Sequence, residues 1–288
     1  MTRLGQQAKH YLTWAPILRR AAEIVREVEA ATGITLTLRK LFYKLVAALL
    51  IPNDMSSYKG LSRKTGVARK DGTFPDLDED KVAIEEPFYF DDVKDALDWL
   101  RNNHVIDRSK TQKYNLLIAC EKKGTVPFLK LWFMQERHIR IVPLGGESSI
   151  TTWQKVKRYI DRDGRPVIVF YLGDFDSSGY GIRTRFKANL GLTDDQFVHV
   201  ALTTEQVDRY LLPRNPGKEK ASRKDREAFR DEVGEDVQVE VDALDEAVLR
   251  ELLEIAIAPY WDERAYQRQL KEEQKQRRQI ARLLRGRR

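Results

Sequence analysis

One stretch contains the strongest structural signal in this chain: RPVIVFYLGDFDSSG, residues 165–179. A short, continuous apolar run between Pro and Gly is typical of a strand that is buried on both faces of a parallel sheet. Acids directly after such a strand stand at the carboxyl edge of the sheet, where open α/β folds bind ligands. Alternate side chains of an extended chain point the same way, so Asp174 and Asp176 can reach one site. Two hard oxygen donors favour Mg²⁺, although Asp and Ser are also ordinary residues of a polar strand-to-helix turn.

Another acid follows a second predicted strand. The apolar run Asn115–Cys120 ends at Glu121, and a helix is predicted from Thr125 to Gln135. A third strand, His138–Pro143, and a helix over Ile150–Ile160 then lead to the strand quoted above. Strand, helix, strand, helix, strand predicts a parallel sheet built with right-handed crossovers. Two strands of this α/β sheet therefore end in acids.

With Glu121 after one strand and Asp-x-Asp after a later one, residues 115–202 resemble the Toprim domain of topoisomerases, primases and some nucleases. The resemblance implies a Rossmann-like fold in which Asp174 and Asp176 bind Mg²⁺. It also implies that Glu121 is a further metal ligand or a general acid/base. Ser177 departs from this pattern, because the family often has Pro directly after the second Asp.

The composition indicates a soluble chain of two domains. Its 288 residues are enough for two compact domains, and a hydrophobic content of 42% allows a real core. We expect a cytoplasmic protein without a membrane span, since 33% of the residues are charged and the apolar runs are short. One cysteine, Cys120, excludes a disulfide framework and a Cys-rich zinc site. The sequence contains no P-loop motif.

The net charge of +7 comes from the end of the chain, because residues 268–288 hold nine Lys or Arg and two Glu. This basic tail is predicted to be helical. It can bind nucleic-acid phosphates through counterion release, or serve only as a solubilising helical end.

Two helices are predicted near the start of the chain, over residues 17–31 and from Thr35 or Thr37 onward. In the second helix the apolar residues predict one buried stripe of Leu38, Leu41, Phe42, Leu45 and Leu49. Tyr43 falls off that stripe and follows Arg39 by four residues, which predicts a phenol on a basic, solvent-facing side. Such a phenol can meet a DNA phosphate, or it can be a boundary tyrosine that shields the edge of the core.

A third helix, predicted over residues 57–69, is strongly basic. Its cations, with the residue that follows it, are Lys59, Arg63, Lys64, Arg69 and Lys70. Asp71 and Gly72 then supply a tight-turn signal. Two helices, a basic helix and a turn predict a winged helix-turn-helix whose basic helix faces DNA. A solvated charged face is the alternative.

The stretch Thr37–Tyr43 is similar to the Arg-x-x-Tyr-Tyr motif of the topoisomerase VI A subunit and its meiotic double-strand-break relatives. In that family a winged-helix domain with a nucleophilic tyrosine precedes a Toprim domain. The resemblance implies that Tyr43 is the nucleophile, beside Arg39, while Phe42 replaces the first tyrosine. It also implies a homodimer that pairs one protomer's tyrosine with the other's metal, and it leaves open a separate ATPase partner.

The predicted domains are a winged-helix DNA-binding domain over residues 1–90, a Toprim domain over 105–262 and the basic tail over 263–288. A helix is predicted near Asp91–Asn102, with Val93 and Leu100 facing inward, and another over residues 245–258. The alternating run of residues 237–242 predicts a strand with Glu240 and Asp242 on one face. This pair can add metal ligands, but a solvent-facing pair is the favoured interpretation.

The leading hypothesis is Mg²⁺-dependent DNA cleavage in which Tyr43 attacks a phosphodiester and stays covalently attached to one DNA end. Its main rival is a Toprim nuclease that uses activated water and needs Tyr43 only for packing. The third interpretation is a winged-helix DNA-binding protein without catalytic activity.

Overall fold

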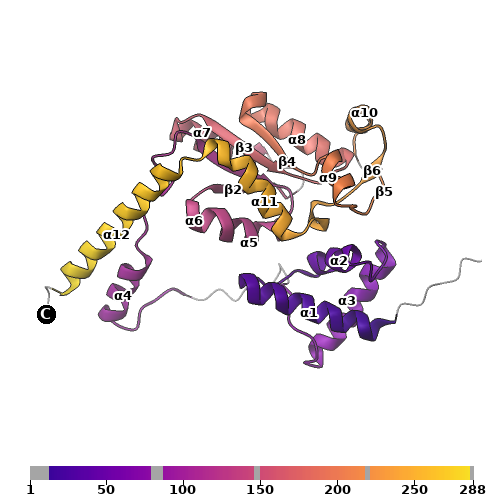
Figure 1. Ribbon diagram of the computed structural model, residues 1–288, viewed down its shortest axis with the longest axis horizontal. Helices are drawn as coiled ribbons and strands as arrows, with labels where there is room; N and C mark the ends of the chain where they lie inside the picture. The colour runs from indigo at the N-terminus through magenta and orange to yellow at the C-terminus, as the bar shows by residue number, and fades with distance from the viewer. Residues whose placement is uncertain (1–12, 79–86, 146–149, 218–220, 286–288) are drawn as a thin grey trace, which may run out of the picture. The chain divides into compact units, whose positions relative to one another are not determined.

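The computed structural model describes residues 13–78, 87–145, 150–217 and 221–285 (Figure 1). The chain divides into two compact units, Met1–Asp80 and Lys81–Arg288, and each is described by itself. The division therefore falls about ten residues before the predicted end of the first domain at residue 90.

Unit 1 contains three helices in its described part: α1 (Trp14–Thr32), α2 (Leu38–Ala47) and α3 (Met55–Lys70). The predicted cap Thr37 begins α2 by accepting a hydrogen bond from the backbone N–H of Lys40, and Asp54 caps α3 in the same way. Fully buried aliphatic side chains of the three helices and the segment before α2 form the core: Ala21, Val25, Leu36, Leu41, Leu45 and Leu61. The helices of the prediction are therefore confirmed.

The wing is not confirmed. Within residues 13–78 the backbone forms no β-hairpin, and its extended pairing is limited to a single parallel bridge between Thr37 and Asp78. The winged-helix assignment stays a prediction that rests on the three helices and their charge.

The predicted faces of α2 are wrong at two positions. Tyr43 is 8% exposed, because α2 is buried on several sides rather than along one stripe, and even Lys40 is 2% exposed. The Tyr43 ring packs edge-to-face against Phe42, and the Arg39 guanidinium lies 5.9 Å from its centre. Leu49, predicted to be buried, is 93% exposed because the helix ends at Ala47.

Unit 2 is built on a four-stranded parallel sheet with the strand order β2-β1-β3-β4. The strands are β1 (Asn115–Cys120), β2 (Arg140–Pro143), β3 (Val167–Leu172) and β4 (Phe197–Ala201). Every residue of the central strands β1 and β3 is buried, which confirms the sequence interpretation. The α/β class and the parallel sheet are correct.

Helices cover both faces of this sheet (Figure 1). On one face α7 (Ile150–Asp163) and α8 (Ser177–Leu190) enclose a core that includes Leu117, Val169 and Phe186. On the other face lie α5 (Val126–Leu129) and α11 (Glu246–Ile257), the second of which confirms the helix predicted over 245–258. Both strands that precede acids are thereby enclosed from two sides.

Two predicted elements are interrupted. The helix expected over Thr125–Gln135 consists of a 3₁₀ turn η1 (Lys123–Thr125), then α5, a π-helical turn η2 (Lys130–Met134) and α6 (Gln135–Arg137). The strand expected over residues 237–242 is only β6 (Val237–Gln238), which pairs with β5 (Asn215–Pro216) and is followed by the 3₁₀ turn η4 (Val241–Ala243). The other short elements are η3 (Asp194–Gln196), α9 (Thr204–Arg209), α10 (Arg223–Val233) and η5 (Ala258–Tyr260).

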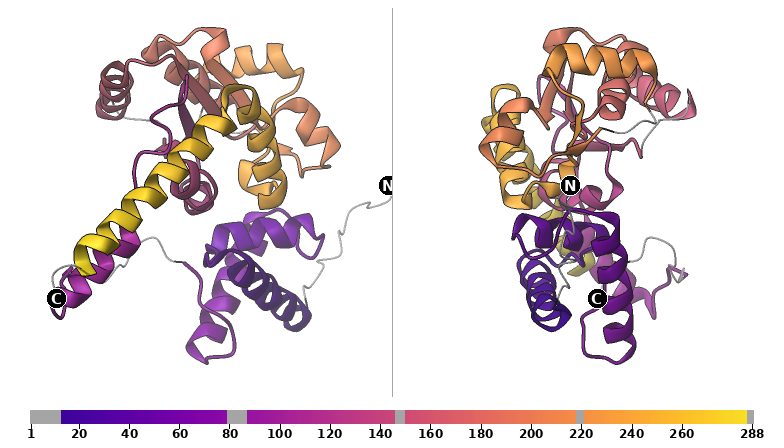
Figure 2. Two further views of the ribbon diagram at one scale, coloured as in Figure 1. Left: turned by 60° about the vertical axis from the view of Figure 1, so that its left-hand side comes forward. Right: turned by 90° about the vertical axis from the view of Figure 1, so that its right-hand side faces the viewer.

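Two helices extend away from the sheet side by side (Figures 1 and 2): α4 (Val93–Asn103) and α12 (Glu263–Arg285), which contains most of the basic tail. The middle of α12 is fixed by Arg108, which donates two hydrogen bonds of 2.9 and 2.8 Å to the buried carboxylate of Glu273. The predicted inward face of α4 is wrong, because Val93 is 76% exposed. Among the described residues, no helix combines the length and the hydropathy that a membrane crossing requires.

Candidate functional site

The predicted acids Glu121 and Asp174 meet at the carboxyl edge of the sheet. Strands β1 and β3 are paired in parallel with Cys120 opposite Leu172, so the residues that follow each strand lie side by side. The backbone N–H of Asp174 donates a hydrogen bond of 3.2 Å to the Glu121 carboxylate. Asp174 and Asp176 are both buried, while Glu121 is half-buried.

The loop after β3 is held by the start of α8. Asp176 is the N-cap of that helix, and its Oδ1 accepts a hydrogen bond of 2.7 Å from the backbone N–H of Gly179. Gly179 passes so close to the loop that a Cβ there would lie 2.2 Å from the carbonyl oxygen of Asp174. The spacing Asp-x-x-Gly thus has a steric reason, because a larger residue would displace Asp174.

A second segment of unit 2, residues 239–241, contacts the same loop. Phe175 and Val239 form an antiparallel bridge with hydrogen bonds of 2.9 and 3.0 Å. Next to this bridge, the backbone N–H of Val241 donates a hydrogen bond of 3.0 Å to Oδ1 of Asp174. This contact places Glu240 and Asp242 at the site.

Both of these additional acids are buried, so the interpretation of a solvent-facing pair is wrong. Asp242 accepts a hydrogen bond of 3.0 Å from the Thr125 hydroxyl, and Glu240 accepts one of 3.2 Å from the Gln238 amide. The physical reason is that β6 ends at Gln238 and the chain turns into η4, so the alternation of an edge strand does not continue. We call Glu121, Asp174, Asp176, Glu240 and Asp242 the acid cluster.

Lys122 belongs to this site, although sequence reasoning assigned it no role. Its Nζ lies 2.6 Å from Oδ2 of Asp174 and 2.7 Å from Oε2 of Glu240. The available signal in the sequence was its position directly after Glu121. Only the folded chain shows that this ammonium bridges carboxylates from two distant segments.

Burial and neighbouring charge set the electrostatics of the site. Loss of hydration and the nearby Glu121 charge raise the pKa of Asp174 to about 8, whereas the Lys122 ammonium acts in the opposite direction. The Glu121 and Glu240 charges raise the pKa of Asp174, and the Lys122 charge offsets them only in part. The surplus favours a site that attracts cations.

The chemistry of the donors suits Mg²⁺, which prefers carboxylate oxygens. Within the described parts of the chain, however, no three or more acids, His or Cys are arranged so that they could hold a metal ion together. Magnesium binding by Asp174, Asp176 and Glu121 therefore stays a prediction.

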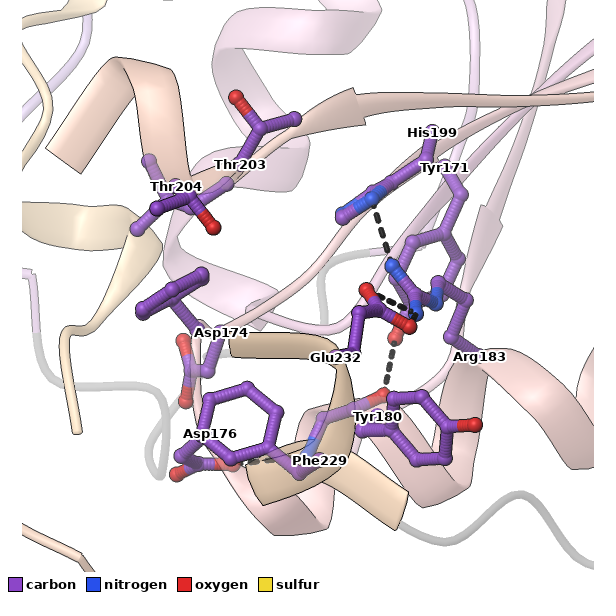
Figure 3. Close-up of a pocket in the computed structure, with 13 residues that line it drawn as sticks. Tyr171, Asp174, Asp176, Tyr180, Arg183, His199, Thr203, Thr204, Phe229 and Glu232 are labelled. Carbon is purple, nitrogen blue, oxygen red and sulfur yellow. Dashed lines mark hydrogen bonds and ion pairs between the residues drawn. The ribbon is translucent and has the colours of Figure 1, made fainter. Parts of the chain in front are cut away.

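A cavity of about 140 Å³ opens beside Asp174 and Asp176 (Figure 3). On its far side Arg183 donates two hydrogen bonds of 2.8 Å to Glu232 and meets Nδ1 of His199 at 2.7 Å. Burial and the Arg183 charge lower the pKa of His199 to about 3, so this histidine is neutral at ordinary pH. No pattern in the sequence predicted this wall of the site.

The remaining predicted site residues belong to unit 1, whereas the acid cluster belongs to unit 2. Tyr43 and Arg39 lie on α2. Of the predicted DNA-binding cations on α3, Lys59, Arg63 and Lys70 are exposed, while Lys64 and Arg69 are half-buried.

Comparison with models of known protein families and with curated proteins finds no match for this chain.

Proposed function

We propose that this protein is a Mg²⁺-dependent DNA-cleaving enzyme whose phosphodiester chemistry takes place at the acid cluster. The observation that carries the proposal is the hydrogen bond between Asp174 and Glu121 at the carboxyl edge of a parallel sheet, with the buried Asp176 two residues farther along the same loop. Ligand sites of open α/β sheets lie at this edge. The resemblance of the same three acids to the Toprim pattern supports the assignment.

Asp174 and Asp176 would hold the metal, with Glu121 as a further ligand or as the general acid/base. A bound Mg²⁺ supplies positive charge that stabilises the phosphate as its negative charge grows in the transition state. The protein's part is to fix the carboxylates, and the hydrogen bonds from Val241 to Asp174 and from Gly179 to Asp176 do so.

The exposed cations of α3 supply the proposed DNA contact. Lys59, Arg63 and Lys70 can neutralise backbone phosphates without reading the base sequence. A homodimer and an ATPase partner stay proposals that rest on the family resemblance alone.

The cleavage step has two possible routes, which differ in the group that attacks the phosphate. In the first, the Tyr43 phenol oxygen bonds to phosphorus, and the displaced DNA oxygen leaves with a proton, so the protein is joined to one DNA end. In the second, water attacks and no covalent adduct forms. The burial of Tyr43, which is 8% exposed, favours the water route, because it removes the exposed phenol that motivated the first.

A cleavage assay that also detects protein–DNA adducts tests the proposal and separates the routes. In Mg²⁺, but not in EDTA, the wild-type protein should cut DNA, and Asp174→Ala should not. If Tyr43 is the nucleophile, Tyr43→Phe loses both cutting and the adduct, since only one oxygen has been removed. If water attacks, Tyr43→Phe cuts normally and neither protein forms an adduct. Wild-type rates from Asp174→Ala would refute the proposed site.

A further inference from the structure

Lys122 occupies the position of a cation within the acid cluster. Its ammonium lies 2.6 Å from Asp174 and 2.7 Å from Glu240, and the two carboxylates are 1% and 7% exposed. Buried carboxylates require positive charge or hydrogen bonds, because their transfer out of water is unfavourable. Lys122 supplies this charge from within the protein.

The carboxylates are fixed by other contacts, whereas Lys122 has a flexible stem. Oδ1 of Asp174 accepts a hydrogen bond from the Val241 backbone, and Oε1 of Glu240 accepts one from Gln238. The Lys122 side chain is 14% exposed, and its four-carbon chain carries a compact, strongly hydrated charge. Of the three charged groups, Lys122 is therefore the one that can leave while the other two stay in place.

We infer that Lys122 is an internal counter-ion that competes with the divalent cation for the carboxylate of Asp174, which it holds together with Glu240. Both cations need the Asp174 carboxylate, and like charges at that separation repel strongly in a buried site. The metal therefore enters only as the ammonium moves away. This inference rests on the proposed function, because it requires the metal to bind at the acid cluster.

Direct titration with Mg²⁺ in the absence of DNA, followed by calorimetry, tests the competition. Lys122→Met should bind Mg²⁺ more tightly than the wild type, by about 10-fold or more, since a charge beside the metal is removed. Lys123→Met is the matched control, because it changes the net charge equally at an exposed neighbouring position. It should leave the affinity within about twofold of the wild type, as expected for a screened surface charge.

Thermal unfolding gives an independent readout. In EDTA, Lys122→Met should unfold at a lower temperature than the wild type or Lys123→Met, because Asp174 and Glu240 lose their shared counter-ion. Adding Mg²⁺ should raise the unfolding temperature of Lys122→Met more than that of the wild type.

A second pair of variants keeps the test decisive if Lys122→Met does not fold in EDTA. These variants are Glu240→Gln and the double variant Glu240→Gln/Lys122→Met. Comparing them shows the effect of the lysine in a protein with one carboxylate fewer. The double variant should bind Mg²⁺ more tightly than Glu240→Gln. Equal affinities in both comparisons would overturn the inference. If Asp174→Asn abolishes Mg²⁺ binding while Lys122→Met has wild-type affinity, only the counter-ion role fails. If the wild type binds no Mg²⁺, the proposed function fails as well.

Discussion

The sheet edge and the segment of residues 237–243 bring acids to the same site in different ways. Glu121 and Asp174 follow regular, completely buried strands, and the pairing of Cys120 with Leu172 fixes their relative positions. Glu240 lies in an irregular turn that reaches the site through the bridge between Phe175 and Val239. The pairing of the strands alone determines where the sheet-edge acids lie, whereas the position of the segment depends on the loop against which it packs.

The segment of residues 237–243 also contacts the residues that follow β1. Thr125 follows β1 by a few residues, and its hydroxyl donates a hydrogen bond to the buried carboxylate of Asp242. Asp242 therefore connects the end of one strand to η4. We expect the sheet-edge acids to determine the chemistry and Asp242 to determine the position of the segment.

The largest expected effect compares one acid from each region. Asp176→Asn removes a charge but keeps an oxygen that can cap α8, since Asn is as good an N-cap as Asp. It should reduce Mg²⁺-dependent DNA cleavage on the order of 1,000-fold, the several kcal/mol that a bound metal contributes. Asp242→Asn, which removes the same charge from η4, should stay within about tenfold of the wild type. Equal losses in a single-turnover cleavage assay would contradict the division of roles between the two regions.

The next effect concerns the glycine that holds the sheet-edge loop. Gly179→Ala should lower the free energy of unfolding by about 3 kcal/mol, because its Cβ would meet the Asp174 carbonyl at 2.2 Å. In the matched variant Gly181→Ala, the Cβ meets the ends of the Asp225 and Arg185 side chains, which can move. Its cost should be below about 1 kcal/mol, since alanine also favours the helix. Urea unfolding measures both, and similar costs would show that the loop tolerates displacement.

The smallest expected effect concerns His199, which lies on strand β4 of the sheet. Because the folded-state pKa of His199, about 3, lies below its ordinary value of 6.5, the unfolded chain takes up the proton first as the pH falls. The stabilisation is complete above pH 6.5 and is lost as the pH falls toward 3. Wild-type protein should lose about 2 kcal/mol of stability between pH 7 and pH 5 that His199→Gln does not lose. Parallel stability curves for the two proteins in urea would show that His199 is not buried as a neutral group.

Sequence reasoning succeeded where local pattern and burial agree. The apolar runs before Glu121 and Asp174 predicted strands that are buried at every position, and their parallel pairing brings two of the predicted acids together. It failed at Tyr43, because helical periodicity assumes one buried stripe and α2 is buried on several sides. It failed again after Gln238, where alternation suggested a strand and the chain forms a 3₁₀ turn.

By itself, the sequence determined the α/β class, the order of the strands along the chain and the acids at their ends. These follow from short-range physics, since side-chain hydropathy and residue spacing define each strand and its edge. Only the tertiary structure placed Glu240 beside Asp174 and inserted the Lys122 ammonium between them. More than a hundred residues separate Lys122 from Glu240, and no local pattern encodes a contact at that distance along the chain.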